Sequence, residues 1–160
     1  MKPCWAGLVA FDKPLGINFD GLFVQNSSLS WIARNSSKPG RDSQDTWVIH
    51  GSPVWSQENL ESDKASIARQ LLTAFFEATG LAPVEPVYLQ AHRWRYALAE
   101  NPLSDMCLWD ADSQIGVSGD WCANSRVEGA FLSGAAIAGR VMGIPDNGPR
   151  QTTGIQASLF

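Results

Sequence analysis

The sequence has little charge and no concentration of positive charge. Only 18% of its 160 residues are Asp, Glu, Lys or Arg, and the formal net charge is −4. A basic run of the kind that tracks a nucleic acid backbone or an anionic membrane surface is missing. We therefore expect no nucleic acid and no membrane partner, and the low charge indicates a surface that is meant to be covered.

Long hydrophobic runs are missing as well. No apolar stretch has the length needed to cross a bilayer, and the first residues lack the charged region, apolar core and cleavage site of a secretion signal. We therefore expect a cytoplasmic protein. A chain of 160 residues suits one domain with a hydrophobic core of its own.

Cysteine and histidine are too few and too scattered for a metal site. Cys4, Cys107 and Cys122 are odd in number and widely spaced, which excludes a disulfide framework or a C-x-x-C pair. His50 and His92 are the only histidines, so no histidine-rich ligand set can form and no metal is expected. We expect the cysteines to be reduced packing residues, with Cys122 as the one candidate exception. A G-x-S-x-G elbow and a phosphate-cradling loop are also absent, which leaves hydrolase and triphosphate chemistry unsupported.

The first half of the chain predicts four strands. Residues 4–11 are apolar and end at the turn DKPLG, residues 19–26 and 29–36 flank a pair of serines as in a hairpin with a tight turn, and residues 45–52 are the fourth strand. Strands in series with short connections form an antiparallel sheet.

One amphipathic helix follows these strands. Apolar residues recur at helical spacing from Ile67 to Ala78, Ser62 or Asp63 is the expected cap at the start, and Gly80 marks the end. We expect this helix to lie across the sheet.

The second half predicts an extended segment, a pair of short strands and a final helix. EPVYLQAHRWRYAL is the extended segment, and DMCLWDADSQIGVSGDW predicts two strands around an Asp-Ala-Asp-Ser turn. The last element, from Val127 to Met142, is rich in glycine and alanine. Each glycine inside a helix costs roughly 0.5–1 kcal/mol relative to alanine, so close approach to another backbone or a flat ligand is the expected reason.

The predicted fold class is therefore α+β, with a mainly antiparallel sheet, a covering helix and a terminal helix. We expect residues 1–104 to form the sheet and its helix, residues 105–143 a strand-turn-helix, and residues 144–160 a flexible tail.

The strongest chemical pattern is GVSGDWCANSRVEGAFLSGAAIAGRV, from Gly116 to Val141. Gly119 allows a backbone to approach a ligand, and Asp120 can accept hydrogen bonds from hydroxyl groups. The first turn of the following helix offers free backbone N–H groups and the positive end of a dipole. By pattern alone, a structural Gly-Asp turn before a closely packed helix explains the segment equally well.

GDW followed by RVEGAFLSGAAIAGRV resembles the carboxy-terminal flavin motif of the flavin-containing amine oxidase superfamily. The order of the segments CWAGLVAFDKPL, WVIHGSPVWSQENLE, AHRWRYA and GDW is similar to the renalase-like branch, over nearly all of the chain up to Gly143. The resemblance implies FAD as cofactor, with Asp120 against its ribityl or diphosphate part. It also implies that Val127, Glu128 and Gly129 face the pyrimidine edge of the isoalloxazine ring, where the helix dipole stabilises charge on the reduced flavin. Alternatively, Glu128 is a glutamate in the first turn whose negative charge interacts favourably with the helix dipole.

One half of that family's pattern has no counterpart. The sequence contains no G-x-G-x-x-G turn after a first strand and no acidic residue placed to hold the adenosine ribose. We therefore expect the carboxy-terminal half of such an enzyme, with the dinucleotide-binding half of the same enzyme as its partner and the Rossmann part missing. The isolated chain is expected to be inactive.

AHRWRYA is the second pattern. Strand alternation sends His92, Trp94 and Tyr96 to one face and Arg93 and Arg95 to the other. By its place in the resemblance, the segment supplies the substrate side, with His92 and Trp94 as catalytic and Arg93 and Tyr96 as substrate-binding candidates. The alternative is that the tryptophan is core and the arginines are solvated.

The activity that the resemblance implies is oxidation of a small reduced nicotinamide species. Hydride would pass to FAD and the electrons then to oxygen, giving hydrogen peroxide. Amine oxidation is the alternative within the superfamily, and a non-catalytic domain that binds a ligand or partner is the alternative outside it.

Overall fold

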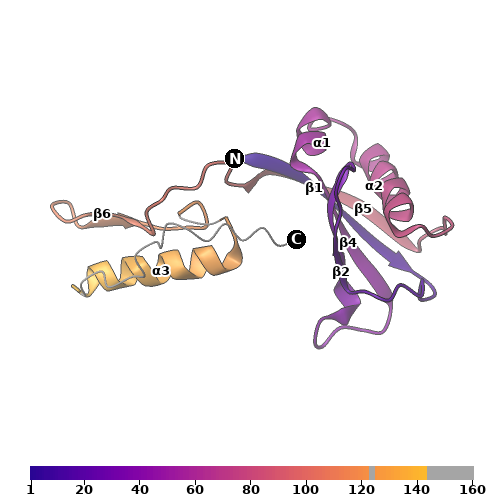
Figure 1. The fold of residues 1–160 in the computed structure, drawn as a ribbon, viewed down its shortest axis with the longest axis horizontal. Helices are drawn as coiled ribbons and strands as arrows, with labels where there is room; N and C mark the ends of the chain where they lie inside the picture. Colours follow the sequence, from indigo (N-terminus) through magenta and orange to yellow (C-terminus); the bar gives the residue numbers. More distant parts are fainter. Residues whose placement is uncertain (123–124, 144–160) are drawn as a thin grey trace. The chain divides into compact units, whose positions relative to one another are not determined.

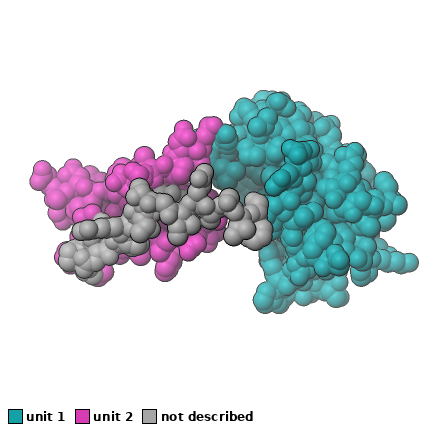
Figure 2. Space-filling view, in the orientation of Figure 1, with its two compact units in different colours: residues 1–98 teal, residues 99–160 magenta. Residues whose placement is uncertain are grey.

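The computed structural model describes residues 1–122 and 125–143. Their fold is mixed α and β with mainly antiparallel strands (Figure 1). The chain divides between Leu98 and Ala99 into two compact units (Figure 2). The expected boundary after residue 104 falls inside the second unit. The expected flexible tail, residues 144–160, lies outside the described residues.

The first unit is built on an antiparallel sheet in which β1 lies between β4 and β5. The strand order is β2-β3-β4-β1-β5, so residues far apart in sequence become neighbours across β1. The bounds are Lys2–Phe11 for β1, Gly21–Phe23 for β2, Leu29–Arg34 for β3, Asp45–Gly51 for β4 and Tyr88–Leu98 for β5.

The β2–β3 hairpin differs from its prediction. β2 is confined to Gly21–Phe23 instead of residues 19–26, and the connection is wider than the tight turn expected at the two serines. The pairing continues only to the hydrogen bond from the Val24 amide to the Ser30 carbonyl, at 3.0 Å. Gly21 faces the ring of Trp31, where a Cβ would lie 2.6 Å from a ring carbon. A larger residue at this position would therefore require the Trp31 ring to move.

A short helix, α1 (Pro53–Glu58), was not predicted. The Ser52 side chain caps it by accepting a hydrogen bond from the Trp55 amide, and Pro53 occupies the first turn, where a missing N–H has no cost. The sequence SPVW carries this signal, although the segment is too short to show helical periodicity.

The predicted amphipathic helix is present as α2 (Lys64–Thr79). Asp63 caps it through the Ser66 amide, at 2.9 Å, and Gly80 ends it with a φ of 70°. α2 packs across one face of the sheet against β1, β3, β4 and β5 (Figure 1).

The core of the first unit lies between α2 and this face of the sheet. Its aromatic centre is Phe75 of α2, whose ring contacts Phe11 of β1 and Trp47 of β4 at centroid distances of 6.2 and 5.6 Å. Burying a large apolar side chain contributes roughly 1.5–3 kcal/mol, so these residues account for much of the unit's stability. The fully buried set also includes Trp5, Leu29, Ile32, Ile49, Ile67 and Leu71.

The second unit contains the predicted pair of short strands and the terminal helix. β6 (Leu108–Asp110) and β7 (Ile115–Val117) form a hairpin, and α3 (Val127–Val141) follows. Among its described residues, Cys122 is the only apolar side chain that is fully buried. This unit has very little core of its own.

Candidate functional site

The outer face of β5 carries a group of exposed aromatic residues. The rings of His92 and Trp94 are in contact, with centroids 4.5 Å apart and planes tilted by 60°. Trp94 is 55% exposed and Tyr96 is 78% exposed, so neither ring belongs to the core. The predicted placement of His92 and Trp94 on one face of the strand is therefore confirmed, and Trp94 is not the core residue of the alternative interpretation.

A hollow borders this aromatic group. Leu8 of β1 and Gln90, His92 and Trp94 of β5 contribute to its lining, and Lys64 of α2 adds a cation to it. A flat apolar surface with one imidazole and one amide beside it can stack a planar heterocycle and offer it hydrogen bonds.

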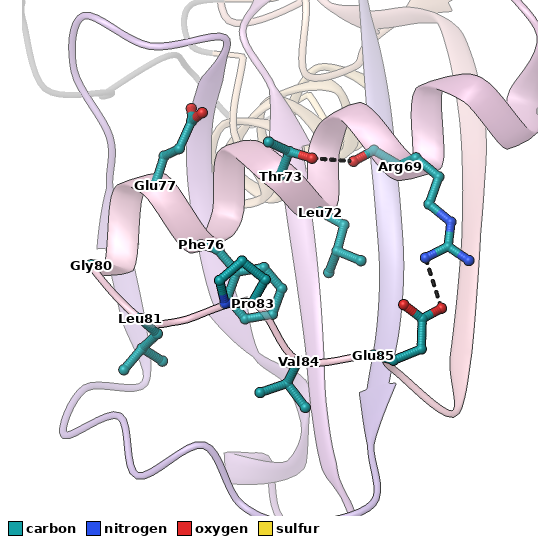
Figure 3. Close-up of a pocket in the computed structure, with 10 residues that line it drawn as sticks. All are labelled: Arg69, Leu72, Thr73, Phe76, Glu77, Gly80, Leu81, Pro83, Val84 and Glu85. Carbon is teal, nitrogen blue, oxygen red and sulfur yellow. Dashed lines mark hydrogen bonds and ion pairs between the residues drawn. The ribbon is translucent and has the colours of Figure 1, made fainter.

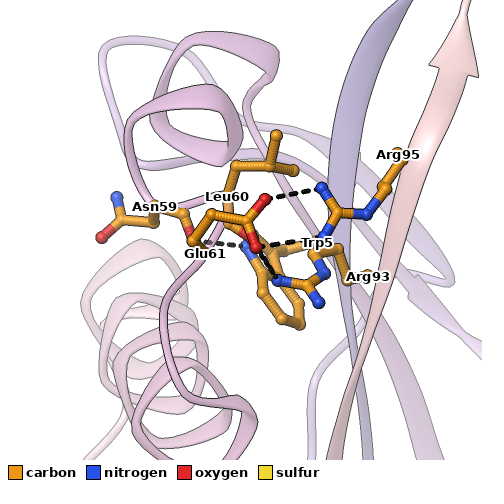
Figure 4. A network of polar contacts seen from close by, with 6 residues as sticks. All are labelled: Trp5, Asn59, Leu60, Glu61, Arg93 and Arg95. Carbon is orange, nitrogen blue, oxygen red and sulfur yellow. Dashed lines mark hydrogen bonds and ion pairs between the residues drawn. The ribbon is translucent and has the colours of Figure 1, made fainter.

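The opposite face of β5 is occupied by two arginines bound to a single carboxylate (Figure 4). Arg95 donates to both oxygens of Glu61, at 2.6 and 3.0 Å, and Arg93 donates to one of them at 3.1 Å. The hydrogen bonds from Arg95 are the main cause that lowers the pKa of Glu61, and Glu61 in turn raises the pKa of Arg95.

Arg93 also ties the segment between α1 and α2 to the sheet. Its guanidinium lies over the buried Trp5 ring, 5.5 Å from the centroid, and donates to the Leu60 carbonyl at 2.5 Å. The Trp5 indole donates to the Asn59 carbonyl at 3.0 Å. Of the two residues expected to bind substrate, Arg93 is engaged in this structural network (Figure 4), whereas Tyr96 is exposed.

In the second unit, the Gly-Asp turn is connected to α3 by a partly buried hydrogen bond. The Gly119 amide donates to the hydroxyl of Ser133, which is fully buried, at 2.9 Å. A Cβ at Gly119 would lie 2.4 Å from the indole nitrogen of Trp121. The space beside Gly119 is thus already filled by Trp121, whereas the sequence suggested close approach of a ligand. Asp120 follows in the turn and is half-buried.

The amino terminus of α3 has no side-chain cap. Arg126 stands at the cap position and makes no such hydrogen bond, and the first intrahelical bond runs from the Ala130 amide to the Arg126 carbonyl. Val127 is 90% exposed and Glu128 is exposed, while Gly129 is buried. Glu128 lies in the first turn, where a carboxylate is favourable to the helix dipole whether or not a ligand is bound.

Two glycines of α3 and one glycine of the neighbouring hairpin differ in the space beside them. At Gly134 and Gly139 an added Cβ would meet no heavy atom within 4 Å. On the hairpin side, a Cβ at Gly116 would lie 2.4 Å from Ile137 of α3. The hairpin therefore covers one side of α3, and within residues 1–122 and 125–143 the side that carries Gly134 and Gly139 is open. The large apolar residues exposed in this unit are Leu103, Leu108, Ile115, Val117, Val127, Phe131, Leu132, Val141 and Met142.

Another hollow lies beside α2, away from the expected site residues (Figure 3). The carboxylate of Glu85 pairs with Arg69 at 2.8 Å across one side of it, and Leu72, Phe76 and Val84 supply apolar lining. None of the predicted site residues contributes to this lining.

The cysteines behave as packing residues. All are free, and burial raises the pKa of Cys4 to about 11. Cys122 is fully buried and Cys107 is partly exposed. Across residues 1–122 and 125–143, no group of three His, Cys, Asp or Glu side chains is placed to hold a metal ion. In the same ranges, no helix combines the length and apolar character required to cross a membrane.

No protein-family model matches this chain. The structure places the expected site residues in two groups, one in each unit. In the first unit, His92 and Trp94 are in contact on one face of β5 and Tyr96 is exposed on the same strand; Gly119, Asp120 and the start of α3 belong to the second. Sequence reasoning missed Glu61 and Ser133, because neither stands in a pattern that distinguishes it from a solvated glutamate or a helical serine.

Proposed function

We propose that this chain is the carboxy-terminal half of a renalase-like, FAD-dependent oxidoreductase. It supplies the substrate-side sheet and the helix that faces the flavin, and the dinucleotide-binding half of the same enzyme supplies the rest. The proposed reaction oxidises a small reduced nicotinamide species with oxygen and a proton, and yields the oxidised nicotinamide and hydrogen peroxide.

The observation that carries the proposal is the arrangement at the start of α3. A Gly-Asp turn is held to the helix by the bond between the Gly119 amide and the buried Ser133 hydroxyl. The helix that it precedes begins without a side-chain cap. Within the part of the chain that the structure describes, its first backbone N–H groups are therefore available to electron-rich oxygens, which suits the pyrimidine edge of a flavin.

The small core of the second unit supports the same proposal. Exposed apolar side chains such as Val127, Phe131 and Ile115 gather on a unit in which Cys122 is the one fully buried apolar side chain among the described residues. Large exposed apolar surface marks a place where another surface binds. A dinucleotide-binding half packed on α3 accounts for this surface and for the glycines of its open side.

The described residues fit one end of FAD and not the other. The α3 amino terminus, Glu128 and the Asp120 turn suit the isoalloxazine and ribityl parts, and the bound cofactor would accept the hydride. In the ranges that the structure describes, no glycine-rich loop at a helix amino terminus suits the adenosine diphosphate. We therefore expect the isolated chain to purify without stoichiometric FAD.

On the substrate side, this chain contributes orientation more than proton transfer. Trp94 and Tyr96 present flat exposed rings, and the His92 imidazole contacts Trp94. Hydride transfer from a dihydropyridine depends on holding the ring at the right distance and angle, so stacking is the main requirement. We assign Trp94 and Tyr96 to stacking and His92 to hydrogen bonding with the substrate.

Reconstitution with a renalase-like amino-terminal half tests the proposal. The joined protein should retain FAD after desalting, seen as a flavin absorption band, and the isolated chain should not. Asp120→Ala should then weaken FAD binding by about 1–3 kcal/mol, the range for a charge-assisted hydrogen bond, or roughly 10- to 100-fold. Asp112→Ala, in the exposed turn between β6 and β7, is the matched control and should have no effect. Equal FAD affinity in both variants would reduce Asp120 to a turn residue.

The alternatives are separated by the same material. Bleaching of the flavin by amines and not by reduced nicotinamides would indicate an amine oxidase. A reconstituted protein that binds no FAD would favour a non-catalytic domain that binds a ligand or partner.

A further inference from the structure

β5 is irregular at the end that carries the exposed aromatic residues. Cys4 of β1 is opposite Trp94, but Lys2 is opposite Leu98, so the β5 strand has more residues than β1 over this stretch. The residue of β1 inside the irregularity is Pro3, which has no N–H to donate to a neighbouring strand. The strand ladder is therefore weakest where Arg95 and Tyr96 follow Trp94. Bulges of this kind re-aim side chains and are frequent beside functional sites.

Glu61 restrains this weakly paired part of β5 from the opposite face of the strand. Its carboxylate accepts hydrogen bonds from Arg93, just before the irregularity, and from Arg95, inside it (Figure 4). The same segment is anchored to the core through the Trp5 indole and the Asn59 carbonyl. One carboxylate thus brackets Trp94 by holding the residues on both sides of it.

We propose that Glu61 is a positioning residue for Trp94 and the His92–Trp94 pair. By fixing Arg93 and Arg95 on the inner face of β5, it sets the direction in which the outer face presents the Trp94 ring. That this ring stacks the substrate rests on the proposed function. The positioning itself is a property of the first unit and does not depend on a cofactor.

Histidine NMR spectra of the full chain measure the positioning directly. The chain has only His50 and His92, so both imidazole signals can be assigned, and the Trp94 ring lies 4.5 Å from His92. Glu61→Ala should move the His92 signals toward their shifts in a Trp94→Leu variant, because the ring-current contribution of Trp94 is lost. Glu61→Gln, which keeps one acceptor oxygen, should give a smaller change in the same direction. The His50 signals, from β4, should stay in place.

Two further variants test whether the change at His92 is specific to the contacts of Glu61. Glu85→Ala removes the exposed ion pair with Arg69 on another part of the same unit and should leave His92 unchanged. Arg95→Met removes two of the three hydrogen bonds to Glu61 while keeping the bulk of the side chain, and should reproduce most of the Glu61→Ala change. Unchanged His92 signals in Glu61→Ala and Arg95→Met would overturn the proposal. Equal movement of His50 and His92 would also overturn it, since the change would then be general loosening.

In a reconstituted enzyme, Glu61→Ala should raise KM for the nicotinamide substrate several-fold with FAD retention unchanged. A reconstituted protein that binds no FAD would contradict the proposed function, and the role of Glu61 would then be decided by the NMR measurement alone. A shift of His92 without any change in KM would overturn the assignment of this positioning to substrate binding.

Discussion

Gly134 lies on the side of α3 that is open among the described residues, and replacing it tests whether that side is covered in an assembled enzyme. No heavy atom lies within 4 Å of the Cβ that an alanine would add there. Its backbone is helical, so alanine adopts the conformation without strain. Gly134 is half-buried, but the space beside it is free, so the intrinsic preference of alanine for the helix, about 1 kcal/mol, should dominate. Gly134→Ala should therefore stabilise α3 in the isolated chain.

Hydrogen exchange of α3 amides is the suitable measurement. A global melting temperature would mix two units whose stabilities differ, whereas exchange reports the local opening of one helix. A gain of about 1 kcal/mol slows exchange about fivefold when exchange follows local opening. Gly116→Ala is the opposing control, because its Cβ would lie 2.4 Å from Ile137 and 2.8 Å from Trp109. Overpacking of this kind costs about 1–3 kcal/mol, so exchange in α3 should become faster.

Gly134→Leu extends the test to the assembled enzyme. In the isolated chain the larger side chain has room, so Gly134→Leu should change the stability of α3 very little. In a reconstituted enzyme it should overpack the interface by about 1–3 kcal/mol and reduce flavin retention. Faster α3 exchange in Gly134→Ala or Gly134→Leu of the isolated chain would refute the reasoning. The open side would then be part of this unit's own packing, and the flavin interpretation of the small residues would lose its main physical support.

Three other predictions concern the packing and titration of single residues. Alkylation of the native chain at pH 8 should label Cys107 well before Cys4, whose pKa is raised to about 11, or the fully buried Cys122, and mass spectrometry of peptides would contradict this if Cys4 reacted first. Phe75→Ala should destabilise the first unit by about 3–5 kcal/mol in urea denaturation, and a loss below about 1 kcal/mol would mean that this ring is not central to the core. Burial lowers the pKa of His50 below 6.5, so as the pH falls the unfolded chain takes up the proton before the folded chain does. The free energy of unfolding of the first unit should therefore decrease as the pH drops below 6.5. His50→Gln should flatten this part of the curve of stability against pH, and an unchanged curve would contradict the prediction.

Several elements of the fold could be predicted because their signals are local. The helical spacing of apolar residues, the Asp63 cap and the positive φ of Gly80 are properties of short segments, and α2 has those bounds. The alternation along β5 is also local, and it correctly separated the face of Trp94 from the face of Arg93. α1 carried a local signal in Ser52 and Pro53 but is too short for periodicity to reveal it.

The candidate site was predicted less completely because its contacts are long-range. Glu61 meets Arg93 and Arg95 only because the sheet order places β5 beside β1 and the α1–α2 segment above them. A glutamate in a polar loop gives no sign of such partners. Gly119 is another case: the space beside it is filled by the Trp121 ring, which no spacing rule predicts.

The sequence by itself determined the type and approximate bounds of most elements, the two faces of β5 and the absence of a disulfide framework. These depend on periodicity, capping and residue type, which act over a few neighbouring positions. Only the tertiary structure decided which side of α3 is covered, which hydroxyl holds the Gly-Asp turn and which carboxylate restrains the bulged end of β5. Those choices depend on side chains distant in sequence that the sheet and helix packing bring within hydrogen-bonding distance.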